Sequence, residues 1–182
     1  MKNVLIVHGT QGSPNGNWFQ WLKKQLQNRR YKVWVPKLPT PGKPRISRNV
    51  KYILANKKWK FDSESVLIGH SSGPVTILGL LNELPENIIV EKCILVAPFT
   101  KSDWEPNSEL FDYDFDFENI KKKSRKFIII HSDTDPYTPL DQPKELARKL
   151  GAELIIKKGE GHFNLEKGPQ YKKFPLLLDL ID

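Results

Sequence analysis

A serine stands between two glycines in the segment Gly69-His70-Ser71-Ser72-Gly73. The apolar run Ser65–Gly69 that leads into it predicts a buried strand, and the apolar stretch Val75–Leu84 after it predicts a helix. A serine held in a sharp turn between a strand and a helix projects its hydroxyl from the edge of a sheet, where it can attack a carbonyl carbon. The pattern predicts Ser71 as a nucleophile and the backbone N–H of Ser72 as a donor to the oxyanion that would form.

A histidine is the side chain that most often activates such a hydroxyl, and the chain has four of them. His8 and His131 each end a predicted strand, and His70 lies inside the serine turn, where we expect it to point away from the pocket. His162 lies in a glycine-rich loop after the last predicted strand, where a mobile imidazole could swing over the edge of the sheet. We therefore expect His162 to be the general base.

A carboxylate is needed to orient that imidazole, and two candidates follow the same predicted strand, Asp133 and Asp135. Pro136 restricts the backbone of Asp135, which helps to fix the direction of its side chain. Asp133 can serve instead as a turn-forming aspartate that accepts backbone N–H groups two residues on. The order serine, aspartate, histidine along the chain is a known order for this triad, and we expect Asp135 to be its carboxylate.

The first predicted strand ends in a His-Gly pair followed by Thr10. After this turn the backbone N–H of Thr10 is the expected second donor of the oxyanion hole, beside Ser72. The alternative is a glycine turn with no catalytic role.

Short apolar runs alternate with helical patterns along the whole sequence, which is typical of a parallel sheet covered by helices. The predicted strands are Asn3–His8, Lys32–Pro36, Ser65–Gly69, Lys92–Ala97, Phe127–His131 and Glu153–Lys157. About five helices are expected, one of them across Tyr171, Phe174 and Leu178. These elements predict one domain over residues 1–182, a three-layer αβα sandwich with a six-stranded parallel sheet in the order 2-1-3-4-5-6.

Aromatic residues are concentrated between the fourth and fifth predicted strands, in the segment Trp104–Phe117. A solvated loop would not need them, so we expect this segment to form a small cap over the site and to favour short acyl groups. The residues expected to contribute to the substrate pocket are Trp104, Phe111 and Phe163.

The His-Gly turn, the GHSSG segment, Asp135-Pro136-Tyr137-Thr138-Pro139 and Gly161-His162-Phe163 together resemble the small serine hydrolases of the α/β-hydrolase superfamily, of the retinoblastoma-binding protein nine type. The resemblance spans nearly the whole chain. It implies a minimal α/β-hydrolase fold that lacks the first two strands and any large lid, with Ser71, Asp135 and His162 as the triad. The expected reaction is cleavage of a small ester through an acyl-enzyme on Ser71.

Two other classes of function are weighed against this one. The first is a catalytically silent α/β-hydrolase-fold module that binds a protein partner, because a fold does not guarantee a function. The second is a nucleic-acid-binding protein, because 29 Lys and Arg against 21 Asp and Glu give a net charge of +8. The lysines are scattered, and the densest cluster, in residues 121–126, has no interleaved aromatic residues, so we expect a solvated basic surface and no nucleic-acid partner.

Several kinds of partner and cofactor have no matching motif. The glycine-rich segment Gly9–Gly16 lacks the spacing of a phosphate-binding loop, and the alternating Asp112, Asp114 and Asp116 lack the glycine and glutamate of a calcium loop. No metal and no cofactor are therefore expected. The apolar start of the chain is too short for a signal peptide and the single Cys93 lies in an apolar run, so we expect a cytoplasmic protein.

Overall fold

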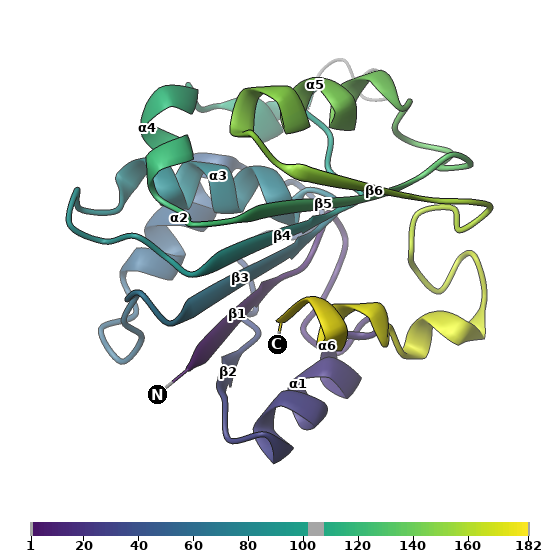
Figure 1. Cartoon of the computed structure of the whole chain (residues 1–182), viewed down its shortest axis with the longest axis horizontal. Coiled ribbons are helices and arrows are strands. Elements are labelled where there is room, and N and C mark those ends of the chain that lie inside the picture. The colour runs from purple at the N-terminus through teal and green to yellow at the C-terminus, as the bar shows by residue number, and fades with distance from the viewer. Residues whose placement is uncertain (1, 102–107, 182) are drawn as a thin grey trace.

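The computed structural model describes residues 2–101 and 108–181, which contain a six-stranded, all-parallel sheet in the order β2-β1-β3-β4-β5-β6 (Figure 1). The strands are β1 (Asn3–Val7), β2 (Lys32–Trp34), β3 (Ser65–His70), β4 (Lys92–Val96), β5 (Phe127–Ser132) and β6 (Glu153–Lys157). The predicted fold class and strand order are confirmed, and the described part of the chain shows no large lid. Parallel strands end at one edge of the sheet, so the segments after β1, β3, β5 and β6 meet there.

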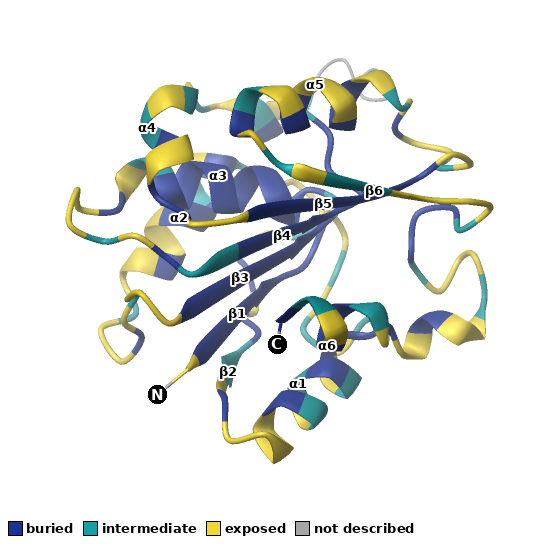
Figure 2. Ribbon diagram, viewed as in Figure 1, coloured by how far each residue is buried: buried dark blue, intermediate teal, exposed yellow. Residues whose placement is uncertain are grey.

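Helices cover both faces of the sheet (Figure 1). The helices α2 (Ile46–Leu54), α3 (Gly73–Glu83), α4 (Phe117–Lys122) and α5 (Asp141–Leu150) lie on one face, and α1 (Phe19–Asn28) and α6 (Leu176–Ile181) lie on the other. Side chains of the central strands alternate between the two layers of core, with Leu5 facing α3 and Ile6 facing α1. The central strands are therefore buried on both faces, and β6 at the edge is more exposed (Figure 2).

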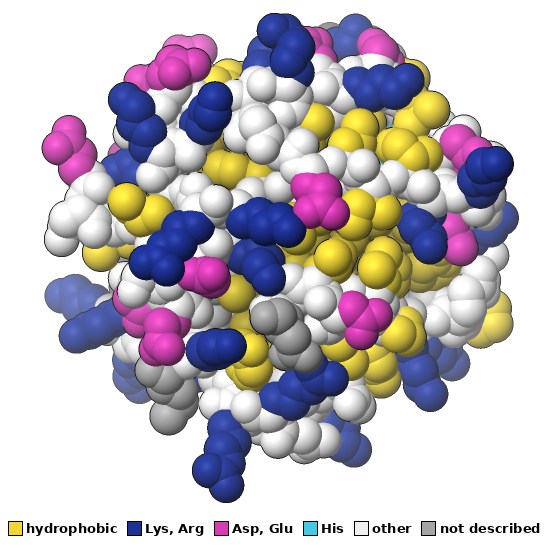
Figure 3. Space-filling view, viewed as in Figure 1, with side chains coloured by type: hydrophobic (Ala, Val, Ile, Leu, Met, Phe, Trp, Pro, Cys, Tyr) yellow, Lys and Arg dark blue, Asp and Glu magenta, His cyan; other side chains and the backbone are white. Residues whose placement is uncertain are grey.

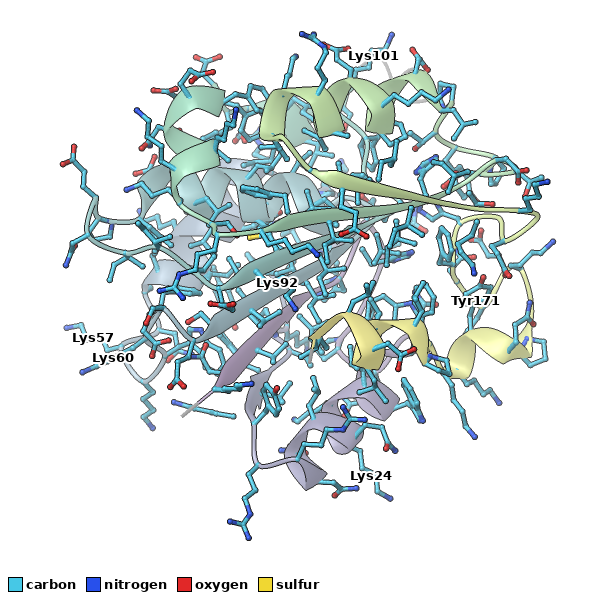
Figure 4. All side chains as sticks on the ribbon, in the orientation of Figure 1. Lys24, Lys57, Lys60, Lys92, Lys101 and Tyr171 are labelled. Carbon is cyan, nitrogen blue, oxygen red and sulfur yellow. The ribbon has the colours of Figure 1, made fainter. Side chains whose placement is uncertain are left out.

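The end of the chain differs from the prediction of one helix. It forms a short 3₁₀ turn, η2 (Pro169–Lys172), followed by α6, with Pro175 between them. Proline disfavours helical backbone in the residue before it, so the helical pattern is broken at that point. The side chain of Lys92 reaches α6 from β4 (Figure 4), and its Nζ donates to the carbonyl oxygens of Leu180 at 2.5 Å and Ile181 at 3.3 Å.

The segment predicted to cap the site also differs from its prediction where it is described. Residues 108–117 form η1 (Glu109–Phe111) and lead into α4, which the sequence patterns did not predict. Phe111, Tyr113, Phe115 and Phe117 pack on the core layer that contains α2 and α3, and the Tyr113 hydroxyl donates to the carbonyl oxygen of Gly79 at 3.3 Å. This part of the predicted cap is therefore wrong: it extends the helical layer instead of covering the serine.

Two further observations concern the distribution of charge on the surface and the length of the helices. Lys and Arg side chains are spread over the visible face and interspersed with Asp and Glu (Figure 3). None of the helices in residues 2–101 and 108–181 is long and apolar enough to cross a membrane.

Candidate active site

Ser71 occupies the tight turn between β3 and α3. Its φ of +60° lies in the left-handed region, and its backbone N–H donates to the carbonyl oxygen of Val96 at 3.0 Å. A Cβ atom on Gly69 would lie 2.5 Å from the Pro74 nitrogen, and one on Gly73 would lie 2.2 Å from the Val7 carbonyl oxygen. The two flanking glycines are thus required by close backbone approaches, and the turn presents a half-buried serine at the end of a central strand.

His162 and Asp135 form a hydrogen-bonded pair across two loops. His162 Nδ1 lies 2.8 Å from Asp135 Oδ2, and the Asp135 side chain has no exposed surface. The other carboxylate oxygen, Oδ1, accepts the backbone N–H groups of Tyr137 at 2.9 Å and Thr138 at 3.1 Å. Burial would raise the pKa of Asp135, but the hydrogen bond and charge of His162 and the Tyr137 N–H outweigh it and lower the pKa. The geometry fixes Asp135 as an ionised acceptor for the imidazole.

A row of side chains after β5 holds the loop that carries His162. Ser132 Oγ accepts the N–H of Glu160 at 2.9 Å, Asp133 Oδ1 accepts that of Gly159 at 2.7 Å, and Thr134 Oγ1 accepts that of Gly161 at 3.2 Å. The sequence suggested that Asp133 would accept hydrogen bonds within its own turn. In the structure its side chain instead accepts one from the neighbouring loop. His162 is buried, with 6% of its side chain exposed, so it is not the mobile loop residue that was expected.

Because of these different contacts, replacing Asp135 and replacing Asp133 with asparagine should have different effects on turnover. Asp135→Asn should lower turnover by about three to four orders of magnitude, because the amide no longer stabilises the imidazolium or the right tautomer. Asp133→Asn should lower it by less than about tenfold, because an asparagine oxygen can still accept the Gly159 N–H. Steady-state rates of the two purified variants on one aryl ester decide between them, and the reverse pattern would show that Asp133 is the triad residue.

Two neighbours hold the backbone around His162 and were not predicted to do so. His70 Nε2 lies 2.8 Å from the carbonyl oxygen of His162, and Trp18 Nε1 donates to that of Phe163 at 3.1 Å. A carbonyl oxygen only accepts, so His70 carries its proton on Nε2. Burial, with the nearby His162, lowers the pKa of His70 to about 3, so its ring is neutral. His70 turns toward the His162 loop and is among the residues that line the cavity at Ser71, so the expectation that it points away from the pocket is wrong.

The neutral His70 has a consequence for stability against pH. A folded-state pKa of about 3 lies below the ordinary 6.5, so below pH 6.5 the unfolded chain binds a proton that the folded chain excludes. The contribution of His70 to stability should therefore fall as the pH drops from about 6.5 toward 3. Urea unfolding at a series of pH values should give a shallower slope for His70→Gln, whose amide can still donate to the His162 carbonyl. An unchanged slope would contradict the assignment.

Ser71 and His162 face a common cavity of about 490 Å³. Its lining consists of Gly9, Thr10, Gln11, Gly12, Ser13, Gly16, Asn17, Phe19, His70, Ser71, Tyr137, His162, Asn164, Leu165 and Glu166. Most of these residues come from the segments after β1 and β6 and from the serine turn, so the cavity lies at the predicted edge of the sheet.

Thr10 lies beside the serine turn, where the oxyanion hole was predicted. Thr10 Oγ1 donates to Ser72 Oγ at 3.1 Å, and a Cβ on Gly9 would lie 2.5 Å from Ser71 Cβ. The backbone after β1 therefore passes directly against Ser71. The next amide, that of Gln11, donates to the carbonyl oxygen of Pro41 at 2.7 Å.

The predicted pocket residues lie elsewhere or outside the described residues. Phe163 is fully buried and stacks on Phe174 at a centroid distance of 5.4 Å, so its assignment to the pocket is wrong. Phe111 packs edge-to-face on Phe99 at 5.9 Å within the helical layer, and it is not among the lining residues. Trp104 lies outside the described residues.

Tyr137 and Glu166 are site residues that the sequence did not single out. The Tyr137 ring lies 4.9 Å from the His162 ring, and its hydroxyl lies 2.6 Å from Glu166 Oε2. Tyr171, which is labelled in Figure 4, lies in η2, and its hydroxyl donates to the Glu160 carboxylate. Only the position of Tyr137, two residues after Asp135, could have drawn attention to it in the sequence.

Comparison with known proteins gives consistent matches. The chain is 28% identical to YdeN of Bacillus subtilis over 184 residues, covering 99% of this chain and 94% of that protein. The crystal structure of that gene product superposes with a TM-score of 0.91 at 27% identity, covering 100% of this chain and 97% of the other. Serine hydrolase RBBP9 of Rattus norvegicus is 27% identical over 166 residues, which is 88% of this chain and 86% of that protein.

The fold and the family are supported by two further matches. An extracellular α/β-hydrolase from a Paenibacillus species shares the fold, with a TM-score of 0.71 at 13% identity, over 100% of this chain and 98% of that one. The model of the family described as "Serine hydrolase" matches residues 4–182. The chain belongs to this serine hydrolase family, and its fold is that of the α/β-hydrolases.

Proposed function

We propose that this serine hydrolase cleaves small carboxylic esters through an acyl-enzyme on Ser71. The observation that carries the proposal is the meeting, at one cavity, of a serine with a φ of +60° and an imidazole bonded to a buried carboxylate at 2.8 Å. This combination matches the requirements of nucleophilic catalysis by a weakly acidic hydroxyl.

In the proposed acylation step, His162 takes the Ser71 proton while Ser71 Oγ bonds to the ester carbonyl carbon. The negative charge that develops on the carbonyl oxygen would be held by the backbone N–H groups of Ser72 and Thr10. His162 then gives the proton to the alcohol oxygen as the carbon–oxygen bond breaks, and Asp135 stabilises the imidazolium in between.

In the proposed deacylation step, a water molecule repeats the attack with His162 again as base. The water oxygen bonds to the acyl carbon, the Ser71 ester bond breaks, and the proton returns to Ser71 Oγ. Every group in the cycle belongs to the chain, the ester or water, so the proposal requires no cofactor.

The cavity supports a small substrate. Its volume of about 490 Å³ lies at the lower part of the range for small-molecule sites, and much of its lining is polar or glycine. A cavity of this size leaves little room for a long acyl chain. A cytoplasmic location is also proposed, because a buried single cysteine suits a reducing compartment.

The test combines a fluorophosphonate probe with a panel of aryl esters of increasing acyl length. We expect covalent labelling of the protein, with the highest kcat/KM on short acyl groups. Absence of both labelling and turnover would favour a catalytically silent binding module, and a steady rise of activity toward long acyl chains would overturn the small-substrate proposal.

A further inference from the structure

The cavity at Ser71 carries a charge opposite to that of the protein as a whole. The chain has a net charge of +8, but the residues found to line this cavity, all within the described ranges, include no Lys or Arg and do include the carboxylate of Glu166. Local charges dominate over distant ones in salt solution, because charges farther apart than about 8–10 Å are largely screened. An entering substrate would therefore meet the carboxylate rather than the basic surface.

Glu166 is an exposed carboxylate that lines the cavity together with His162. The Tyr137 hydroxyl lies 2.6 Å from Glu166 Oε2, and this hydrogen bond is the main cause of a pKa of Glu166 that lies below its ordinary value. The Tyr137 ring, 40% exposed, lies edge-on to the His162 ring at 4.9 Å. A carboxylate and an exposed aromatic ring thus adjoin the imidazole, and this pair of groups is suited to an ammonium ion.

The position beside His162 indicates which half of the substrate meets these groups. His162 is proposed to return its proton to the departing alcohol oxygen, so the leaving group has to lie within reach of the imidazole. The Tyr137 ring adjoins that imidazole, and its hydroxyl bonds to Glu166, so the two residues reach the cavity from the loops that carry Asp135 and His162. They are accordingly placed on the leaving-group side of the cavity.

We propose that Glu166 and Tyr137 form a cation-binding subsite that favours esters whose alcohol portion carries a positive charge, such as a quaternary ammonium. The inference deepens the proposed function and rests on it. Lys167 does not line the cavity at Ser71; it lines a smaller neighbouring pocket of about 280 Å³ together with His162 and Glu166, and its side chain lies against Gly161. Esters with an anionic alcohol portion are disfavoured by the same carboxylate.

Three acetyl thioesters test the subsite, because they share one acyl group and one detection method through the released thiol. Their leaving groups are thiocholine, 2-mercaptoethanol and 3-mercaptopropionate, which are cationic, neutral and anionic. For the wild-type protein, kcat/KM should be highest for the thiocholine ester and lowest for the mercaptopropionate ester. Raising the salt concentration should reduce the ratio of these two values.

Three variants distinguish the effect of the Glu166 charge from the effect of its hydrogen bond with Tyr137. Glu166→Gln should lower the cation-to-anion ratio by about three- to tenfold and remove most of its salt dependence. Tyr137→Phe breaks the hydrogen bond but keeps the carboxylate and the ring, so it should keep most of the ratio. Glu145→Gln, which removes a carboxylate paired with Lys149 on α5, is the matched control and should keep all of it.

The outcomes distinguish the inference from the function on which it rests. An unchanged ratio in Glu166→Gln, or equal losses in Glu166→Gln and Tyr137→Phe, would overturn the subsite while turnover of the neutral thioester still supports a hydrolase. Failure of the wild-type protein to label with a fluorophosphonate and to cleave any of the three thioesters would overturn the proposed function, and the subsite with it.

Discussion

Replacing Ser71 with alanine is expected to abolish covalent labelling by a fluorophosphonate and to lower kcat/KM on aryl esters by about five to six orders of magnitude. The hydroxyl is the proposed nucleophile, and no other group would take its place in the acyl-enzyme. The fold should be little affected, because alanine loses one oxygen at a half-buried position and tolerates the strained φ of +60° no worse than serine. Mass spectrometry of the labelled protein and initial rates measure the two effects.

The neighbouring Ser72→Ala variant is the matched control. Its proposed contribution is the backbone N–H, which alanine keeps, whereas its hydroxyl accepts a hydrogen bond from Thr10 Oγ1 at 3.1 Å. We expect labelling to persist and turnover to fall by less than about tenfold. Labelling that survives in Ser71→Ala would show that the nucleophile is a different residue.

The strands and their order were predictable because parallel strands buried on both faces leave a strong pattern. β1 and β3 each contain an uninterrupted run of apolar residues, and each ends within one residue of its predicted end. Once those ends were known, the topology alone brought the segments after β3, β5 and β6 to one edge. That is why Ser71, Asp135 and His162 could be nominated without coordinates.

The prediction that the aromatic segment caps the site was wrong in residues 108–117, because the sequence pattern there is compatible with more than one packing. Phe111, Tyr113, Phe115 and Phe117 alternate with acidic residues, and such a pattern predicts one buried face without saying which surface covers it. In the structure that surface is α3, where the Tyr113 hydroxyl bonds to the Gly79 carbonyl oxygen. The choice between a cap and a helical layer depends on contacts across 34 residues, which no local pattern encodes.

Phe163 and Glu166, in the loop after β6, are two further residues whose positions depend on more than the local sequence pattern. Phe163 follows the proposed base directly, but its φ of +53° turns the ring into the core beneath α6. Glu166 lines the cavity, and its carboxylate accepts a hydrogen bond from Tyr137, a residue 29 positions earlier in the chain. Backbone reversals and long-range polar contacts of this kind decide which side chains line a pocket, and the sequence gives only the residues from which they can be chosen.

Replacing His162 is the second change with a very large expected effect. His162→Ala should lower kcat on aryl esters by about five to six orders of magnitude, because no base would remain to take the Ser71 proton. Slow residual turnover would come from the oxyanion donors and binding alone. Asp135 would also lose the partner at 2.8 Å that lowers its pKa and would remain as a buried carboxylate bonded to two backbone N–H groups.

That buried carboxylate makes a stability control necessary. The His162 side chain is 6% exposed and its loop is held by Ser132, Asp133 and Thr134, so the loop should stay in place while the variant loses about 1–3 kcal/mol of unfolding free energy. His162→Gln, which can still donate an N–H toward Asp135, should recover much of that stability and none of the activity. Circular dichroism and urea unfolding check the fold of both variants. Near-normal ester turnover in a folded His162→Ala protein would contradict His162 as the general base. His70, whose Nε2 lies 2.8 Å from the backbone carbonyl oxygen of residue 162, would then be the next candidate for that role.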